Sequence, residues 1–290
     1  MKKFLDLGIQ PLANKYLTSK DLNSKKKEQF YHLEVGFDNK TKLVSILNKV
    51  ASHIMFDNKY PYRSSMSKTM IESFKKLSKK IKRIYKPKLI LEIGSNDGSL
   101  IKNFNKKNAI CVEPCKNLAV LTKKRGLKTY AEYWNMKLAK KIKSKYNKID
   151  LIYSANTLSH ISDLESVFNS INYTLADEGI LIIEDPSLYE CLKGVAYDQF
   201  YNEHIYVFSL LSIKNIIKKH NLEVFNVEKL KTHGGSIRYF IKKISNTKIK
   251  IHDNVKKQLS EEIRYKMNNF ETYIDFGNKV KKSKKKLIQI

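Results

Sequence analysis

Residues 89–100, LILEIGSNDGSL, decide the fold of this chain. Their apolar first half predicts a buried parallel strand that is covered on both faces. Gly94 and Gly98 then permit a backbone geometry or a close approach that a side chain would block. A dinucleotide fingerprint would need glycines at G-x-G-x-x-G spacing, but this loop has Asn96 and Asp97 instead. Side chains that accept hydrogen bonds favour a cationic, phosphate-free ligand of nucleotide type.

A second strand end supports this interpretation. Residues 109–114, AICVEP, form a short apolar run that ends at Glu113. In a doubly wound fold, this is about where a carboxylate binds the ribose hydroxyls of a nucleotide. Together the two strand ends predict a site for S-adenosylmethionine (SAM). The alternative is a glycine turn beside a solvated Glu in an unrelated α/β domain, and the pairing of the two motifs disfavours it.

From residue 88 onward, expected strands and helices alternate, which predicts an α/β fold with a parallel sheet. The helix before this region has apolar residues at helical spacing, namely Ile71, Phe74, Leu77, Ile81 and Ile84. The expected strands are residues 89–93, 109–113, 150–154, 179–184, 222–227 and 236–241, and the expected helices are 99–107, 116–125, 164–175 and 210–220.

The chain is strongly basic, with 56 Lys and Arg against 28 Asp and Glu and a net charge of +28. A field of this size raises the question of nucleic-acid binding. Only five of the basic residues are Arg, however, and the lysines are scattered among Asn and Ile, as in residues 140–143. Because base and phosphate recognition favours the Arg fork, we interpret the lysines as a solvated surface and expect no nucleic-acid partner.

The three cysteines and the N-terminus indicate the compartment. Cys111, Cys115 and Cys191 provide neither an even disulfide framework nor two zinc-type pairs, which indicates a reducing environment. The first residues, MKKFLD, contain no apolar signal core, and no run approaches the roughly 20 apolar residues that span a bilayer. We therefore expect a soluble, cytoplasmic protein without a membrane span; the oligomeric state stays open.

Three segments are expected along the chain. Residues 1–60, which include the polar stretch from Ser19 to Glu28, predict a small appendage of turns and short strands. Residues 61–245 contain the alternating strands and helices. Residues 246–290 are expected to be helical and are highly charged.

Several long motifs occur in a fixed order along the chain. They are residues 6–8 with 11–14, 64–67, 92–98, 160–161, 201–204 and 233–236. With these motifs the chain resembles SAM-dependent sugar C-methyltransferases over residues 5–245. The resemblance implies a class I, Rossmann-like methyltransferase fold and methylation of C3 of a nucleotide-linked 4-keto-6-deoxy sugar.

The resemblance also implies the roles of individual residues. Tyr201 and His204 would form the catalytic pair that handles the proton taken from the acceptor carbon, and His160 is a further catalytic candidate. Tyr62 and His233 match positions that line the sugar pocket of the family. SAM would be bound by Gly94, Ser95, Asn96, Asp97, Gly98, Glu113 and Asn156.

The chemistry of these residue types agrees with the assignment. A neutral imidazole with a pKa near 6.5 can accept a proton, and a phenol can donate a hydrogen bond to a developing enolate oxygen. Glu203 is expected to orient the imidazole of His204. His160 could instead be a satisfied polar residue, and His233 could shape a turn. Residues 133–134, Tyr-Trp, could stack on adenine or pack in the core.

Two features depart from the family pattern. The family begins with a zinc module of cysteine pairs, whereas no Cys precedes Cys111 here and Asp38 and Thr41 stand where the second pair is expected. We therefore expect no zinc. Members of the family also continue into a second Rossmann-like domain, whereas this sequence ends at Ile290, which predicts either a shortened enzyme with a different acceptor or a truncated relic.

These observations predict a SAM-dependent methyltransferase that acts on a sugar or sugar-nucleotide precursor in surface-polysaccharide or deoxysugar biosynthesis. One alternative is an O-methyltransferase that modifies a sugar hydroxyl or a phosphate-type or phosphoramidate-type oxygen of a capsule precursor. A second alternative is a non-catalytic SAM-binding partner protein.

Overall fold

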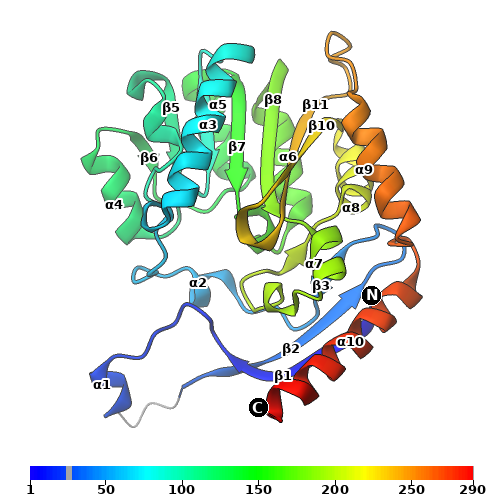
Figure 1. The fold of residues 1–290 in the computed structure, drawn as a ribbon. Coiled ribbons are helices and arrows are strands. Elements are labelled where there is room, and N and C mark those ends of the chain that lie inside the picture. Colours follow the sequence, from blue (N-terminus) through cyan, green and yellow to red (C-terminus); the bar gives the residue numbers. More distant parts are fainter. Residues whose placement is uncertain (24–27, 290) are drawn as a thin grey trace.

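The computed structural model describes residues 1–23 and 28–289. A seven-stranded sheet in the order β10-β11-β8-β7-β4-β5-β6 forms its centre (Figure 1). The five strands from β6 to β8 are parallel, which confirms the predicted α/β alternation, and β11 and β10 complete the sheet in antiparallel pairings. The strands are β4 (Ile90–Ile93), β5 (Ala109–Val112), β6 (Lys128–Tyr130), β7 (Ile149–Ala155), β8 (Leu175–Pro186), β10 (Leu222–Leu230) and β11 (Ser236–Lys243).

The strand order positions the binding site. Strand β4 is entirely buried and pairs with β5 on one side and with β7 on the other. The connection after β4 leads to β5 on one side, and the connection after β7 leads to β8 on the other. In doubly wound sheets, the crevice for a ligand opens at the carboxyl ends of the strands at such a switch point.

Helices cover both faces of the sheet. Helix α3 buries Phe74, Leu77 and Ile81 against one face of the sheet, whereas Ile84, the last residue of the helix, is 50% exposed. Helices α5, α6 and α8 contribute to the core on the other face. The helices are α3 (Lys68–Ile84), α4 (Lys116–Lys124), α5 (Met136–Tyr146), α6 (Leu164–Thr174), α7 (Leu188–Gly194), α8 (Leu210–Ile217) and α9 (Asp253–Arg264).

The helix predicted over residues 99–107 does not form. Two short 3₁₀ turns, Ile101–Asn103 and Lys106–Asn108, take its place. The side-chain amide of Asn103 donates to two backbone carbonyls, and the Asn105 side chain accepts from the backbone N–H of Lys107. Asn side chains compete with the helical hydrogen-bond pattern in this way, so the segment folds into turns.

A second sheet lies below the first in Figure 1 and has the order β1-β2-β3-β9. Helix α10 (Phe270–Ile288) runs along β1, and a Cβ at Gly277 would lie 2.4 Å from the Phe4 carbonyl oxygen. Segments from both ends of the described chain therefore share one core. The remaining elements are β1 (Lys2–Pro11), α1 (Ser19–Leu22), β2 (Phe30–Phe37), β3 (Val44–Ile46), α2 (Ser52–Met55) and β9 (Tyr206–Val207).

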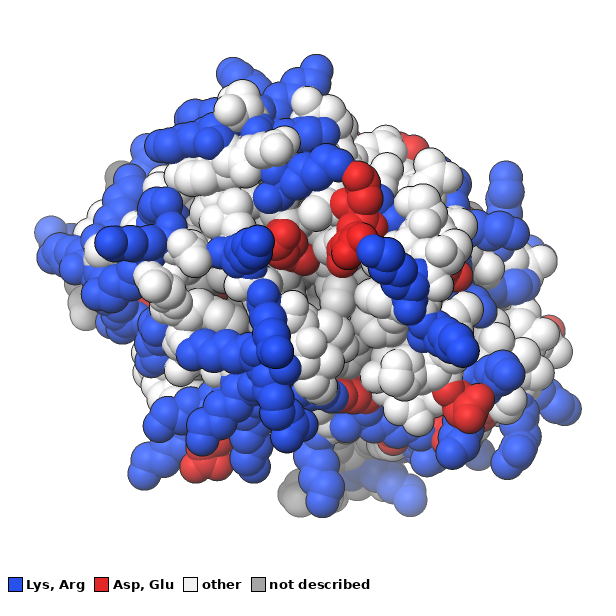
Figure 2. Space-filling model, turned by 90° about the horizontal axis from the view of Figure 1, so that it is seen from above, with Lys and Arg blue, Asp and Glu red and all other residues white. Residues whose placement is uncertain are grey.

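The expected division into residues 1–60, 61–245 and 246–290 stays a prediction, although the three segments pack against one another. Within the predicted polar stretch from Ser19 to Glu28, residues 24–27 lie outside the described residues, as does Ile290. Among the helices that the structure describes, none has both the length and the apolarity to cross a membrane. Lysines and arginines spread over the face that is uppermost in Figure 1, with few acidic residues among them (Figure 2).

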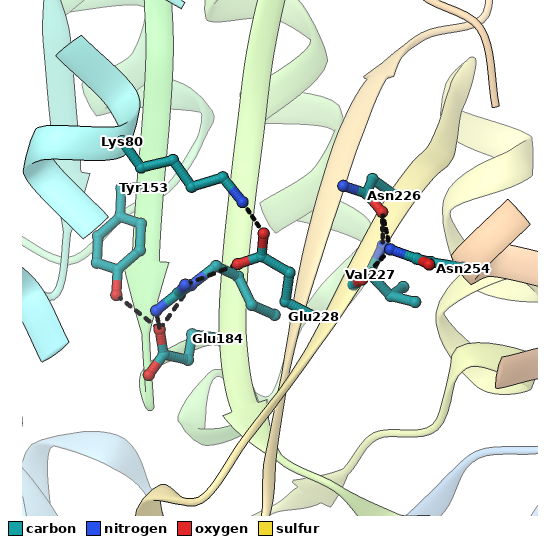
Figure 3. A network of polar contacts seen from close by, with 8 residues as sticks. Lys80, Tyr153, Glu184, Asn226, Val227, Glu228 and Asn254 are labelled. Atoms are coloured by element: carbon teal, nitrogen blue, oxygen red, sulfur yellow. Dashed lines mark hydrogen bonds and ion pairs between the residues drawn. The ribbon is translucent and has the colours of Figure 1, made fainter. Parts of the chain in front are cut away.

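A buried polar network joins four strands and α3 (Figure 3). Arg238 of β11 donates from Nε and Nη2 to Oε2 of Glu184 on β8, at 3.0 and 2.7 Å, and from Nη1 to Glu228 of β10 at 3.0 Å. Tyr153 of β7 donates to the same Glu184 oxygen at 3.2 Å, and Lys80 of α3 contacts Glu228. Two cations thus balance two carboxylates; Arg238 and Glu184 are buried, whereas Lys80 and Glu228 are partly exposed.

The first prediction concerns this network. We expect Glu184→Ala to lower the free energy of unfolding by about 3–5 kcal/mol, because it leaves the buried guanidinium of Arg238 without its main partner. The matched control is Asp177→Ala on the same strand, whose exposed carboxylate pairs with Lys148 and Lys243 and should matter little. Urea unfolding of both variants measures the difference, and equal losses would contradict the prediction.

Candidate active site

A cavity of about 540 Å³ opens at the carboxyl ends of the parallel strands, with the loops after β4, β5, β7 and β8 and residues of the N-terminal segment in its wall. Its size suits a small-molecule ligand. Three of the predicted site residues, Asp97, Gly98 and Glu203, lie outside its lining. The structure brings the others together around it, namely Tyr62, Gly94, Ser95, Asn96, Glu113, Asn156, His160, Tyr201, His204 and His233.

The glycines of the predicted cofactor loop have different functions. Gly94 has a φ of +70°, and a Cβ there would lie 2.1 Å from Oγ1 of Thr157, so only glycine fits. Gly98 has a φ of +78° and approaches Thr122 of α4 rather than the cavity. The buried carboxylate of Asp97 accepts a hydrogen bond from Ser99 at 2.6 Å. Asp97 and Gly98 therefore stabilise the loop without lining the cavity.

Asn96 ties the cofactor loop to a neighbouring segment. Its Oδ1 accepts from the backbone N–H of Ser64 at 2.9 Å, and its Nδ2 donates to the Tyr62 carbonyl at 3.1 Å. Its own backbone N–H donates to Oε2 of Glu113 at 2.7 Å. The backbone has a φ of +50°, which Asn tolerates better than most residues. Asn96 thus positions Tyr62 at the cavity.

Glu113 is held by its backbone surroundings. Oε1 accepts from the Cys115 N–H at 2.9 Å, in addition to the bond from Asn96 to Oε2. Burial raises the pKa of Glu113, and these two hydrogen bonds oppose that shift. Each carboxylate oxygen retains a second lone pair, which a ribose hydroxyl could occupy.

Sequence reasoning missed Glu92 as a site residue. This side chain on β4 lines the cavity, is 4% exposed, and its Oε2 has no hydrogen-bond partner. Burial raises the pKa of Glu92 well above its usual range. The signal in the sequence was the single acid inside an apolar strand. Because no Lys or Arg is among the described residues of the lining, Glu92 fits a cationic group of a ligand.

Tyr201 and His204 form a hydrogen-bonded pair in the cavity wall. His204 Nδ1 lies 2.9 Å from the Gln199 carbonyl oxygen and must donate, because a carbonyl only accepts. A neutral imidazole then presents Nε2 as an acceptor, 2.9 Å from the Tyr201 hydroxyl. Burial lowers the pKa of His204 to about 4, so the ring is neutral at physiological pH.

The expectation that Glu203 orients this imidazole is wrong. The Glu203 carboxylate accepts hydrogen bonds from Asn14 at 2.9 Å and from the Tyr60 hydroxyl at 2.8 Å. The partner of the imidazole is instead the backbone carbonyl of Gln199, because neighbouring side chains of this turn extend in different directions. Backbone partners of this kind leave no signal in a sequence.

Three further predicted residues complete the wall. His160 stacks on Phe56 with ring centroids 5.3 Å apart, and burial lowers its pKa well below the usual range. Nε2 of His160 is buried without a hydrogen-bond partner, so it is available to a ligand. Asn156 Nδ2 lies 3.4 Å from Nε2 of His233. His233 has a φ of +51°, in keeping with the turn-shaping role considered from the sequence.

Trp134 combines the two roles considered from the sequence, because it packs in the core and also faces the cavity. It is 5% exposed in the core, donates from Nε1 to the Val167 carbonyl at 3.4 Å and also lines the cavity. Tyr133 is 41% exposed and donates to the Phe56 carbonyl at 3.2 Å. Core packing and ligand contact are therefore compatible at this site.

Comparison with known proteins identifies matching regions along the chain. A methyltransferase domain matches residues 62–227, a C-methyltransferase C-terminal domain matches residues 231–290, and a putative zinc binding domain matches residues 1–56. The C-methyltransferase NovU of Streptomyces niveus is 28% identical over 241 residues, which are 81% of this chain. The matched part spans 57% of the length of NovU.

The chain is also similar to solved structures at low sequence identity. The PH0226 protein of Pyrococcus horikoshii has a TM-score of 0.49 at 13% identity and covers 63% of this chain and 94% of its own. A SAM-dependent methyltransferase of Clostridium acetobutylicum has a TM-score of 0.46 at 15% identity and covers 62% and 96%.

The N-terminal segment does not fit a structural zinc ion. It contains no Cys, whereas such sites use four Cys or His ligands. Asp38, at one of the expected ligand positions, accepts from the backbone N–H groups of Lys40 and Thr41. The ligand atoms of Asp6, His32 and Glu34 lie within 4.8 Å of one another, but the ammonium of Lys3 pairs with both carboxylates.

The second prediction follows from Glu113. We expect Glu113→Ala to weaken SAM binding roughly 10- to 100-fold, because hydrogen bonds to a charged group are lost. Titration calorimetry measures the affinity, with the fluorescence of Trp134, the one Trp in the chain, as a second readout. Glu132→Ala, which removes the exposed partner of Lys141, is the matched control. Unchanged affinity in Glu113→Ala would contradict the assignment.

The third prediction concerns metal. The purified protein should contain no stoichiometric zinc, and a chelator should leave its thermal unfolding midpoint unchanged. Elemental analysis and a melting curve test this. One tightly bound zinc per chain would contradict the prediction. In that case, loss of the zinc in His32→Ala would locate it beside Asp6 and Glu34.

The comparisons and the geometry agree. The methyltransferase domain covers more than half of the chain, the central sheet is doubly wound, and Glu92 and Glu113 line one cavity at the ends of its parallel strands. The predicted class I fold and the predicted cofactor are confirmed. The chain belongs to the methyltransferase family, as a C-methyltransferase-like member that uses SAM.

Proposed function

We propose that this enzyme methylates a carbon atom of a sugar or sugar-nucleotide precursor in the cytoplasm, within surface-polysaccharide or deoxysugar biosynthesis. The observation that carries the proposal is the hydrogen-bonded pair of Tyr201 and His204 in the cavity that also contains Glu113. A base beside a phenol suits an acceptor whose carbon must lose a proton next to a carbonyl.

Residues at the ends of several strands would bind the cofactor. Glu113 would bind the ribose hydroxyls, Glu92 the amino group, and Asn156 would contact the cofactor from the end of β7. SAM supplies a methyl group on a positively charged sulfur. A lining without Lys or Arg among its described residues suits that charge.

Tyr201 and His204 would handle the proton. Tyr201 would turn its hydroxyl from His204 to the carbonyl oxygen of the acceptor, which frees Nε2 of His204. Nε2 then takes the proton from the neighbouring carbon, and the electron pair of the broken C–H bond moves into the enolate. The enolate carbon would bond to the methyl carbon while the bond from that carbon to sulfur breaks, and neutral S-adenosylhomocysteine would leave. The protein therefore mainly positions two reactants and moves one proton. His160 and His233 would contact the acceptor.

O-methylation is the competing reaction, and His204 could serve as its base. The described lining holds three acidic residues, Glu92, Glu113 and Asp198, and neither Lys nor Arg. Such a cavity disfavours an acceptor that reacts through a phosphate or phosphoramidate oxygen. A sugar hydroxyl remains the form of O-methylation that product analysis has to distinguish.

The fourth prediction tests the base. With S-adenosylhomocysteine in deuterated water, a 4-keto sugar nucleotide should exchange the hydrogen next to its carbonyl. Because burial lowers the pKa of His204 to about 4, exchange should stay constant from neutral pH to roughly pH 5 and fall as the pH drops through about 4. An unperturbed imidazole would lose activity near pH 6.5.

His204→Asn should suppress this exchange at least about 100-fold and leave SAM affinity intact. His252→Asn, at an exposed position outside the cavity lining, is the matched control. Mass spectrometry follows the label, and NMR of the methylated product locates the new bond. A methyl group attached through oxygen would refute carbon as the acceptor atom.

A further inference from the structure

The segment after β1 reaches the acceptor side of the cavity. Ala13 and Asn14 line it, although the motif of residues 11–14 had no assigned function. Asn14 Nδ2 donates to Oε1 of Glu203 at 2.9 Å, and the Tyr60 hydroxyl donates to Oε2 at 2.8 Å. Asn14 and Glu203 are 189 residues apart in the sequence.

Glu203 depends on these two donors. It is 2% exposed, and burial raises its pKa, while the hydrogen bonds from Asn14 and Tyr60 oppose the shift. Loss of the Asn14 amide would leave one buried carboxyl oxygen without a partner. Such a group is costly, so the turn that carries Glu203 would move toward water.

The turn in question contains the catalytic pair. The His204 N–H donates to the Tyr201 carbonyl at 2.9 Å, and the Ile205 N–H donates to the Glu203 carbonyl at 3.0 Å. Glu203 lies between Tyr201 and His204 in the sequence but outside the cavity lining, and its side chain accepts the hydrogen bond from Asn14. One hydrogen bond therefore connects that segment to both groups that would move the proton.

The Asn14 segment is itself fixed. Leu12 is 8% exposed in the main core, and the backbone N–H of Lys15 donates to the Leu12 carbonyl at 3.2 Å, which closes a turn around Asn14. A turn anchored by a buried side chain can hold Asn14 in one position.

We propose that Asn14 is a positioning residue that aligns Tyr201 and His204 through Glu203, so that the N-terminal segment completes the acceptor half of the active site. This inference rests on the proposed function for its catalytic consequence. The alignment itself can be measured without an acceptor.

Amide hydrogen exchange provides that measurement. In Asn14→Ala, peptides that cover residues 201–205 should exchange faster by about tenfold or more, while residues 94–98 keep their protection. The matched control is Asn48→Ala. Asn48 also belongs to residues 1–60, and its Nδ2 also donates to a glutamate oxygen, Oε2 of Glu34, at 2.9 Å. Asn48 lies outside the cavity lining. Unchanged protection of residues 201–205 in Asn14→Ala would overturn the inference.

Catalysis provides a second measurement. Asn14→Ala should lower kcat for the exchange of the 4-keto sugar nucleotide roughly 10- to 100-fold, since small misplacements of catalytic groups have such effects. SAM affinity should stay unchanged in the same variant. Equal losses in kcat and in SAM affinity would indicate general destabilisation and refute a positioning role.

Two further variants separate alignment from bulk stability. Asn14→Asp places two carboxyl groups in contact, which can share a proton at low pH but repel each other once both ionise. The activity of Asn14→Asp should therefore fall as the pH rises. The pH profile of the parent enzyme should show no such decrease. The double variant Asn14→Asp, Glu203→Gln places the carboxylate at position 14 and the amide at position 203. This exchange should restore both the protection of residues 201–205 and kcat. Failure to restore either would contradict the proposal.

The two proposals can fail independently. If the parent protein exchanges no 4-keto sugar nucleotide, the proposed function fails. Hydrogen exchange in Asn14→Ala and in the exchanged pair still decides whether Asn14 aligns the turn.

Discussion

The close approach of Gly94 to Thr157 is the contact on which the active site depends. It joins the loop after β4 to the loop after β7, two neighbouring strands at the centre of the sheet, at a distance that leaves no room for a Cβ. This contact fixes the separation of Glu92 and Asn156, which line the same cavity. The connection after β4 leads to β5 and the connection after β7 leads to β8 on the opposite side, so the two loops diverge from this point of contact.

Local patterns in the sequence were sufficient for six of the seven strands of the main sheet; the strand list lacked β6, whose three residues are partly or fully exposed and form no apolar run. Strands such as β4 and β5 are buried on both faces, so their apolar runs are a direct consequence of their environment. The pairing of Tyr201 with His204 was also predictable, because both belong to one short motif. By contrast, the turns over residues 101–108 depend on Asn side chains that replace helical hydrogen bonds, which helical periodicity does not reveal.

The acceptor side was harder to predict because its contacts join distant parts of the chain. Nothing next to Glu203 in the sequence indicates that its partners are Asn14 and Tyr60. The cavity also contrasts with the surface: the chain carries a net charge of +28, yet the described lining contains acidic residues and no Lys or Arg. Folding has therefore separated lysines, which water solvates well, from a compartment whose ligand is itself a cation.

The pairing of β3 with β9 has a consequence for the order in which the protein folds. Strand β9 contains only Tyr206 and Val207, but it completes the sheet that β1, β2 and β3 begin. During synthesis these first three strands leave the ribosome long before β9, and α10 follows later still. Until then, the β3 edge and the apolar face around Phe4 and Val35 have no partner. Exposed edges of this kind promote association between nascent chains, so the N-terminal sheet is open to such association until β9 and α10 pack on it.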